Sequence, residues 1–339
     1  MSKRWLRKWI IGTLATVLLV SCTQKKEEVI VYSSVDQVFS EPVLKEFEQQ
    51  SGIAVKMVFD TEETKSTGVM NRLIAEKTNP QCDLFWSGDP LRNIMLKSKG
   101  ITAPYHSDAT SQIPLYAQDK EGHWIGFSAR ARVLIYNKKI ISQSELPRTI
   151  FDLTLSRYHG QTAIANPLFG TTTFHIAALF STLGDEKGKA WMDALKQNGV
   201  IIATSNGDVK RRVLRGEIAM GITDTDDAFE AKKENPDIDY IFLDQDKGGM
   251  GTLIMPNALS LIANSPNPQN AKTLIKYLLS KEVEAKLAIS CAQMPLIQGS
   301  KAIDGIADLN AVVPMRIPYD KTSATLLRIQ GYLRSWLER

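Results

Sequence analysis

Asp224, Asp226 and Asp227 place three carboxylates within four residues. Side chains this close repel one another unless a cation or hydrogen-bond donors compensate their charge. We expect Asp227 to cap the helix that follows and at least one of the other two carboxylates to face a ligand. A solvated turn that only caps this helix is the alternative interpretation.

A second polar motif, Gly170-Thr171-Thr172-Thr173, stands at the start of a predicted helix over 172–183. The first backbone N–H groups of a helix lack partners within it, and together with the helix dipole they favour an anion. We therefore predict that this motif binds the anionic part of a ligand. The alternative is that the threonines only cap the helix.

Two arginines, Arg130 and Arg132, lie in a predicted long strand over 124–136. Arg130 could pair with Asp224 or Asp226, or hold an anion through two parallel hydrogen bonds. An ion pair that only joins strands is an equally open interpretation for Arg130, and we expect Arg132 to be a surface charge. Anion-binding donors beside a carboxylate cluster suit a small solute with a negative end and a positive or hydroxyl-rich end, such as an aminoalkyl phosphonate or a sugar phosphate.

Motifs of common enzyme classes are missing from the sequence. Its four histidines show no His-x-x-x-His spacing, and there is neither a Gly-x-Ser-x-Gly elbow nor a phosphate-binding Gly-x-x-x-x-Gly-Lys-Ser/Thr loop. His175 follows the threonine motif, where we expect packing or capping. Trp86, Trp124 and Phe127 are expected mainly in the core. We expect a binding protein that is not an enzyme and has no cofactor.

The order of the predicted elements is that of an α/β fold. Apolar strands at 29–34, 53–59 and 83–86 alternate with helices, which favours a parallel sheet covered by helices. The strand over 124–136 is long enough to leave one domain and enter another. A second α/β set follows it, then a strand over 252–263 split by Pro256, an amphipathic helix over 269–290 and a last helix over 323–336. The predicted organisation is a signal peptide at 1–21, a tether at 22–28, a first lobe at 29–127 and 253–339, and a second lobe at 128–252.

Ligands of open α/β sheets lie beyond the carboxyl ends of the strands. This rule selects polar positions that follow the predicted strands, and the two hinge segments 128–132 and 253–257 add further polar side chains. The candidate ligand residues are Ser33, Ser34, Asp36, Ser87, Gly88, Asp89, Ser128, Arg130, Gly170, Thr171, Thr172, Thr173, Asp224, Thr225, Asp226 and Asn257.

The N-terminus has the parts of an export signal. Lys3, Arg4, Arg7 and Lys8 precede an apolar run of eleven residues at 10–20, which is shorter than the roughly 20 residues of a membrane span. Cys22 follows Leu-Val-Ser and resembles the lipobox of bacterial lipoproteins, in which this cysteine is lipidated. An ordinary signal peptide with an incidental cysteine is the alternative.

The charge of the chain bears on its partners, and its cysteines bear on a possible disulfide. The formal charge of +4 arises from 41 basic and 37 acidic residues, and removal of the four basic residues of the signal leaves a mature chain near neutrality. This argues against a nucleic-acid partner. Cys82 and Cys291 remain, and the sequence leaves open whether they form a disulfide or two buried free thiols.

The order of several motifs resembles the periplasmic solute-binding proteins of ABC importers, in the branch that binds ferric iron, phosphonates or phosphate esters. The motifs that carry the resemblance are Val31–Ser34, Asn71–Lys77, Cys82–Asp89, Gly170–Thr173, Gly221–Asp227 and Pro266–Ser280. The resemblance implies a type II periplasmic-binding-protein fold, with two α/β lobes joined by a two-strand hinge and the solute between them. It also implies a permease and an ATPase as partners, a monomer, and a periplasmic location at a membrane, or the cell surface in a host without an outer membrane.

Ferric iron is the runner-up ligand within this branch. Ferric-binding relatives use a histidine after the first strand, a glutamate after the third and a tyrosine pair in the second lobe. The matching positions here hold Asp36, Asp89 and Thr225-Asp226, so the phenolate ligands are absent. If iron is bound, these positions imply Asp36, Asp89 and Asp226 as its hard oxygen ligands. An exported lipoprotein without a transport role, or an enzyme on the same scaffold, is the third class.

Overall fold

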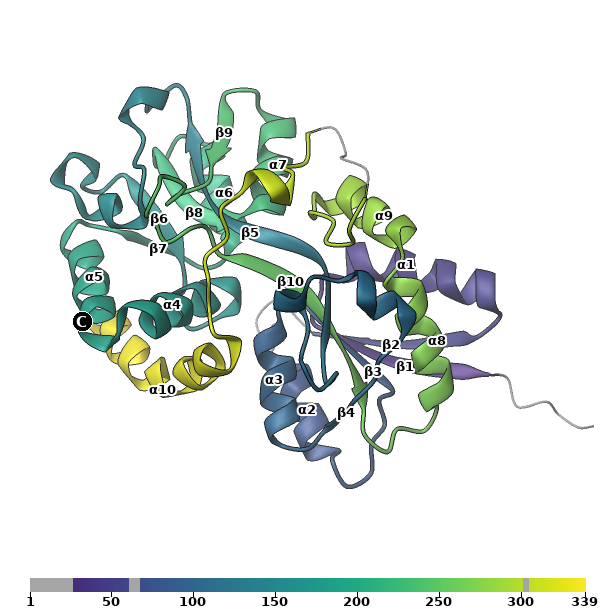
Figure 1. The fold of residues 1–339 in the computed structure, drawn as a ribbon. Helices are drawn as coiled ribbons and strands as arrows, with labels where there is room; N and C mark the ends of the chain where they lie inside the picture. The colour runs from purple at the N-terminus through teal and green to yellow at the C-terminus, as the bar shows by residue number, and fades with distance from the viewer. Residues whose placement is uncertain (1–26, 61–67, 301–304) are drawn as a thin grey trace, which may run out of the picture.

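The computed structural model describes residues 27–60, 68–300 and 305–339. The predicted signal peptide, Cys22 and most of the tether lie outside the described residues. The described residues form two α/β lobes joined by two long strands (Figure 1). No helix among the described residues has both the length and the apolar character needed to cross a membrane.

Each lobe is built on parallel strands, as the alternation of strands and helices predicts. In the first lobe β1 pairs in parallel with β2 and β3, and in the second lobe β6 pairs in parallel with β7 and β8. The first-lobe elements are β1 (Glu28–Ser33), α1 (Gln37–Ser51), β2 (Ala54–Phe59), α2 (Gly68–Ala75), β3 (Leu84–Ser87), α3 (Pro90–Ser98), β4 (Thr102–Ala103), α8 (Pro268–Leu278) and α9 (Lys281–Cys291). The second-lobe elements are β6 (Thr162–Ala165), α4 (Gly170–Leu183), α5 (Asp185–Gln197), β7 (Ile201–Ala203), α6 (Asn206–Leu214), β8 (Met220–Asp224), α7 (Thr225–Glu234) and β9 (Ile238–Ile241).

The lobes are connected through β5 (Ile125–Asn137) and β10 (Ile254–Ile262), which run antiparallel to each other. The first part of β5 pairs with β10, and its last residues, from Arg132 onward, pair with β8. The sheet order is β2-β1-β3-β10-β5-β8-β6-β7. The prediction that this long strand passes from one domain into the other is therefore confirmed.

The crossing strands contain an irregularity at the predicted hinge. Their register shifts between Pro256 and Asn257, and Ser128 takes a left-handed φ of 41°. Ser128 donates its N–H to Glu284 at 2.8 Å, and Asn257 donates to the Ser128 carbonyl at 2.6 Å. Ser128 and Asn257, predicted as ligand residues, thus belong to a buried network that shapes β5. Motion at this hinge stays a prediction.

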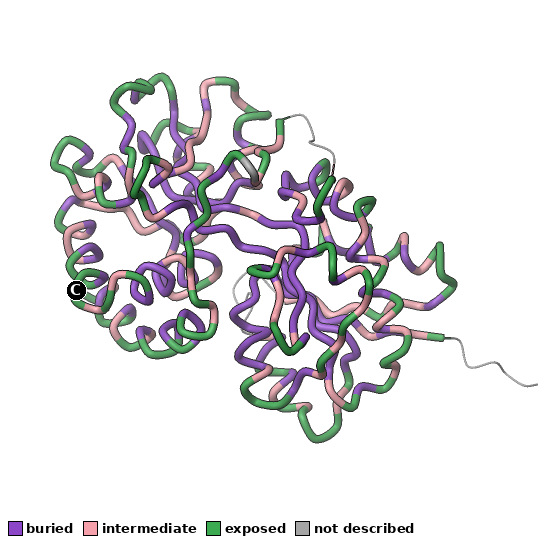
Figure 2. Tube along the Cα trace, in the orientation of Figure 1, coloured by how far each residue is buried: buried purple, intermediate pink, exposed green. Residues whose placement is uncertain are grey.

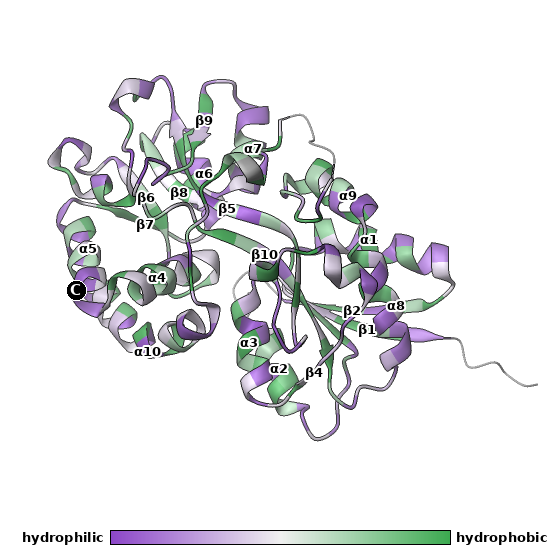
Figure 3. Ribbon diagram, viewed as in Figure 1, coloured by the Kyte–Doolittle hydropathy of each residue, from purple (hydrophilic) through white to green (hydrophobic). Residues whose placement is uncertain are grey.

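Both lobes have apolar cores centred on their strands. Figure 2 shows that buried residues are concentrated along these strands, and Figure 3 shows that hydrophobic residues are concentrated there as well. Because β5 crosses from one lobe to the other, Phe127 and Ala129 pack in the first lobe, whereas Leu134 and Tyr136 pack with α4 and α5 of the second.

Two helix predictions need correction. The single helix expected over 269–290 is broken into α8 and α9, because Ser280 caps α9 by accepting a hydrogen bond from the Val283 N–H at 3.2 Å. The last helix, α10 (Tyr319–Glu338), was placed in the first lobe. It packs instead mainly on α4, with its beginning against α3, because Leu326, Ile329, Leu333 and Trp336 complete the core around α4.

The sequence left open whether the two cysteines form a disulfide or remain free thiols. Cys82 and Cys291 are both buried free thiols. Burial raises the pKa of the Cys291 thiol to about 12, and burial also raises the pKa of Cys82. Both thiols are therefore protonated and unreactive at neutral pH.

Candidate functional site

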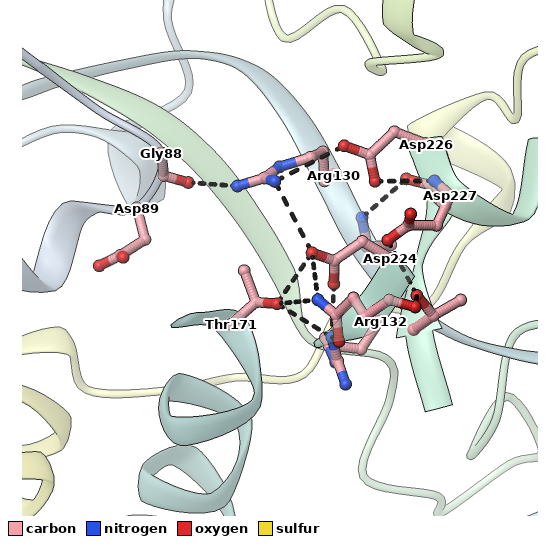
Figure 4. Close-up of polar contacts among 12 residues, drawn as sticks. Gly88, Asp89, Arg130, Arg132, Thr171, Asp224, Asp226 and Asp227 are labelled. Atoms are coloured by element: carbon pink, nitrogen blue, oxygen red, sulfur yellow. Dashed lines mark hydrogen bonds and ion pairs between the residues drawn. The ribbon is translucent and has the colours of Figure 1, made fainter. Parts of the chain in front are cut away.

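Arg130 lies where the two lobes meet and contacts both of them (Figure 4). Its Nη2 donates to the carbonyl oxygen of Gly88, in the β3–α3 turn of the first lobe, at 2.8 Å. Its Nη1 lies 3.6 Å from Asp226 Oδ2 and 3.7 Å from Asp224 Oδ2, both in the second lobe. The residues expected to meet across the lobes are therefore brought together around one guanidinium group.

A side chain at residue 88 would crowd this junction. A Cβ atom added there would lie 3.1 Å from Arg130 Nη2, tighter than nine in ten real Cβ contacts, so the guanidinium would have to shift by a few tenths of an ångström. The turn is also fixed by Ser34, whose hydroxyl accepts a hydrogen bond from the Gly88 N–H at 3.2 Å. The absence of a side chain at residue 88 thus lets Arg130 reach the backbone of the first lobe.

Arg132 is buried beneath this junction, so the prediction that it is a surface charge is wrong. Only 2% of its side chain is exposed, and its Nη1 donates to Asp224 Oδ1 at 2.6 Å. The same nitrogen donates to Thr171 at 3.0 Å and to Asn206 at 3.2 Å. Arg132 is enclosed because β5 runs alongside the end of β8 here, next to the beginning of α4.

The threonine motif at the beginning of α4 does contact an anion, but that anion belongs to the protein. Thr171 Oγ1 donates to Asp224 Oδ2 at 2.8 Å, and Thr172 Oγ1 donates to Asn206 Oδ1 at 3.4 Å. Thr173 is fully buried, and its hydroxyl finds no partner among the described residues. Gly170 starts the helix with a left-handed φ of 58°. Binding of a solute by this motif stays a prediction.

The three clustered carboxylates differ in charge state. Burial alone would raise the pKa of Asp224, but the positive charges of Arg132 and Arg130 outweigh it and hold that pKa below its usual value. Burial, together with the nearby Asp227 and Asp224, raises the pKa of Asp226 to about 7 against the opposing effect of Arg130. Asp226 therefore keeps its proton to a higher pH than Asp224 does.

Asp227 does not cap α7 as predicted. Its Oδ2 accepts a hydrogen bond from the Thr223 hydroxyl at 3.0 Å, and its Oδ1 lies 3.5 Å from Lys210 Nζ. Burial, with the charge of Asp224, raises its pKa. Asp226 instead accepts the backbone N–H of Asp227 at 3.1 Å, because the first N–H groups of a helix need outside acceptors.

Most predicted site residues of the first lobe stabilise its turns. The hydroxyls of Ser33 and Ser87 accept backbone N–H groups two residues further on, at 3.1 Å and 3.4 Å. Asp89 caps α3 by accepting the Leu91 N–H at 2.9 Å, and its other oxygen faces Arg92 at 3.4 Å. In the second lobe the Thr225 hydroxyl contacts β5 by accepting a hydrogen bond from the Ala131 N–H at 3.2 Å. Turn and helix-end N–H groups thus engage these side chains locally.

The three aspartates implied for iron have separate roles. Asp89 is committed to the α3 cap, Asp226 lies beside Arg130, and Asp36 begins α1 with its charge acting on Arg130. Within 27–60, 68–300 and 305–339, no group of three or more His, Cys, Asp or Glu side chains is arranged to hold a metal ion.

Sequence reasoning missed one member of the site, Asn206. It begins α6, directly after the Ser205 cap, and its Nδ2 donates to Thr171 at 2.8 Å and to Asp224 at 3.2 Å. The strand-end rule would have selected Asn206, had β7 been recognised as a strand.

His175 was expected to pack or to cap the helix, and its side chain is only partly exposed. Burial, and then the charge of Arg132, lower the pKa of His175 to about 3, so its imidazole is neutral.

Comparison with known proteins gives a family match. The family described as bacterial extracellular solute-binding protein matches residues 43–313. The iron uptake protein A1 of Synechocystis is 26% identical over 317 residues, which cover 85% of this chain and 86% of that protein. A putative 2-aminoethylphosphonate-binding periplasmic protein of Salmonella paratyphi A is 24% identical over 334 residues, covering 96% and 92%.

Solved structures share the fold. Iron-bound HitA from Pseudomonas aeruginosa superposes with a TM-score of 0.82 at 22% identity, covering 91% of this chain and 99% of that one. AfuA from Actinobacillus pleuropneumoniae, with exogenous fructose-6-phosphate bound, superposes with a TM-score of 0.77 at 21% identity, covering 92% and 98%. The two-lobe periplasmic-binding-protein fold is thereby shown.

Proposed function

Because this chain belongs to the bacterial extracellular solute-binding protein family, we propose that it captures a small anionic or zwitterionic solute between its lobes and delivers it to the permease of an ABC importer. Its role is then binding and transfer rather than catalysis. As a delivery protein it would act as a monomer, with the permease and the ATPase as its partners.

The observation that carries this proposal is the position of Arg130 between the lobes. Its one short hydrogen bond is to Gly88, and its Nη1 lies beyond hydrogen-bond distance from both carboxylates. Its Nε finds no acceptor among the described residues. Nε is also buried, so we propose that an anionic group entering between the lobes pairs with Nη1 and Nε, since a guanidinium binds anions with paired hydrogen bonds.

The second half of the proposed site is Asp226. Its carboxylate lies 3.6 Å from Arg130 and its side chain is 16% exposed. A solute with a phosphonate and an amine would place its anion on Arg130 and its ammonium group on Asp226. The similarity to a putative 2-aminoethylphosphonate-binding protein supports this class of ligand.

Ferric iron is a second candidate because of one observation. Asp226 provides a hard oxygen ligand at the lobe junction, and iron uptake or iron-bound proteins are among the similar chains. Iron here would depend on carboxylates, since Thr225 and Asp226 stand where the family resemblance expects tyrosines.

We further propose that Cys22 is lipidated and holds the protein at a membrane surface. Replacement of Cys22 by serine would release the exported protein from the membrane fraction into the soluble fraction. Unchanged membrane association of the Cys22→Ser protein would contradict the anchor.

The proposed function is tested by a thermal-shift panel on the purified mature chain. The compounds are 2-aminoethylphosphonate, fructose 6-phosphate and ferric citrate, and a native mass spectrum identifies any ligand that co-purifies. We expect the aminophosphonate to raise the melting temperature most, since binding to the folded state alone stabilises it. A shift with ferric citrate alone would favour the iron candidate, and the absence of any shift together with a ligand-free mass spectrum would contradict the proposal.

A further inference from the structure

Donors from three elements converge on the carboxylate of Asp224. Arg132 Nη1 lies 2.6 Å from Oδ1, and Thr171 Oγ1 and Asn206 Nδ2 lie 2.8 Å and 3.2 Å from Oδ2. Arg132 comes from β5 and Thr171 from the beginning of α4 (Figure 4). Asn206 comes from the beginning of α6. We refer to these three donor residues as the α4 cradle.

The chemistry of the α4 cradle is that of an oxyanion site. It combines a guanidinium, a hydroxyl and an amide at the N-terminus of a fourteen-residue helix, all of which favour negative charge. Arg132 is nearly inaccessible to water, so its charge must be compensated inside the protein. Asp224, whose side chain is 3% exposed, supplies that compensation.

We propose that Asp224 acts as a built-in anion, which fills the α4 cradle and thereby excludes an external oxyanion from it. This proposal replaces the sequence-based prediction that Thr171 binds the anionic part of the solute. The solute then brings its anionic group to Arg130 alone. Asp224 is thus a specificity-determining residue: it leaves the junction with a single guanidinium available to one anionic group of the solute.

The two guanidinium groups support this division. Arg132 makes a direct hydrogen bond to Asp224, whereas Arg130 lies 3.7 Å from the same carboxylate and its side chain is 13% exposed. An incoming anion can therefore reach Arg130 without breaking a short hydrogen bond to a carboxylate. To enter the α4 cradle it would have to displace Asp224 from three donors.

The test uses inorganic phosphate as the probe and calorimetry on the full mature chain. We expect Asp224→Ala to bind phosphate at least about tenfold more tightly than the wild type, because the vacated cradle accepts an external oxyanion. Adding Thr171→Val to Asp224→Ala should abolish the gain, whereas adding Arg130→Met should leave most of it. Asp227→Ala, which removes a carboxylate of the same cluster outside the cradle, is the matched control and should show no gain.

Equal phosphate affinity of Asp224→Ala and the wild type would overturn the proposal. A gain in affinity that is lost on adding Arg130→Met but kept on adding Thr171→Val would also overturn it. If Asp224→Ala does not fold, a crystal structure of the wild type grown in phosphate decides. Phosphate at Arg130 with Asp224 still bound to Arg132 is the expected result, and phosphate between Arg132 and Thr171 contradicts it. These outcomes do not depend on which solute is transported, so they can fail while the proposed function stands.

Discussion

Two arginines, two residues apart on β5, differ in their surroundings and therefore in their roles. Arg132 is held by hydrogen bonds to Asp224 and to side chains of α4 and α6. Arg130 has one short hydrogen bond, to Gly88, and longer contacts to Asp224 and Asp226. Arg132 thus stabilises the second lobe, and Arg130 is the arginine that we propose to bind the solute.

This difference predicts different losses of stability. Arg132→Met leaves Asp224 buried without its closest cation and should lower the free energy of unfolding by about 3–5 kcal/mol. Arg130→Met removes the hydrogen bond to the Gly88 carbonyl and the longer ion contacts, and should cost about 1–2 kcal/mol. Urea unfolding of the two variants measures the difference, and equal losses would show that the two arginines do not have separate roles.

A pH dependence follows from Asp226. Its pKa in the folded protein, about 7, lies above the ordinary value of 3.8, so the folded state keeps this proton after the unfolded chain has released it. The folded state therefore loses stability as the pH rises from about 4 to about 7, by up to about 4 kcal/mol relative to a neutral residue. The melting temperature of Asp226→Asn should accordingly fall less than that of the wild type between about pH 5 and about pH 8. An equal fall of the melting temperature in Asp226→Asn and the wild type would contradict the raised pKa of Asp226.

At the scale of the elements, a carboxylate of α9 fixes the irregular part of β5. Glu284 is fully buried and accepts N–H groups from Ser128 at 2.8 Å, and from Leu296 and Ile297 at 2.9 Å each. Burial raises its pKa, and these donors oppose that rise. The left-handed Ser128 is thus held in place two residues before Arg130.

Glu284→Gln should lower the free energy of unfolding by about 2–3 kcal/mol, because one amide group cannot accept all three N–H groups and brings two donors of its own. Glu282→Gln, on the same helix with a side chain that is 63% exposed, is the matched control and should change stability by less than about 0.5 kcal/mol. Denaturant unfolding compares the two variants. An equally large loss of unfolding free energy in Glu282→Gln would contradict the stabilising role of the buried Glu284 carboxylate.

The sequence predicts most elements because their signals are local. Apolar runs followed by polar residues reveal β1 and β3, and a glycine, Gly52, ends α1 in a left-handed conformation. The sequence does not reveal that Arg132 is buried or that α10 packs on α4, because both depend on neighbours that are distant in the chain. For the same reason it predicts that Ser128 and Asn257 face a ligand, whereas the structure engages both in the hinge network.

At the scale of the whole molecule, α10 contacts both lobes. Tyr319, at its beginning, has its ring centroid 5.5 Å from that of Trp124 and 6.3 Å from that of Phe174. Ser323 donates to the Leu91 carbonyl of α3 at 3.4 Å. The end of the helix contributes to the second-lobe core, where Trp336 is 1% exposed.

Trp336→Ala should therefore lower the free energy of unfolding by about 3–5 kcal/mol through the cavity it leaves. Leu327→Ala on the same helix, where the leucine is 56% exposed, is the control and should have almost no effect. Thermal unfolding of both variants tests whether α10 is an integral part of the second lobe. Similar melting temperatures for the two would contradict that placement.

Capture of a solute through Arg130 is tested most directly by calorimetric titration of the wild type, Arg130→Met and Arg148→Met with the compound that gives the largest thermal shift. Arg148 is the matched control because its side chain is 83% exposed and its ion contact, at 3.9 Å, is to the equally exposed surface residue Asp246. We predict an affinity at least about a hundredfold weaker for Arg130→Met and unchanged for Arg148→Met. Wild-type affinity in Arg130→Met would contradict the account.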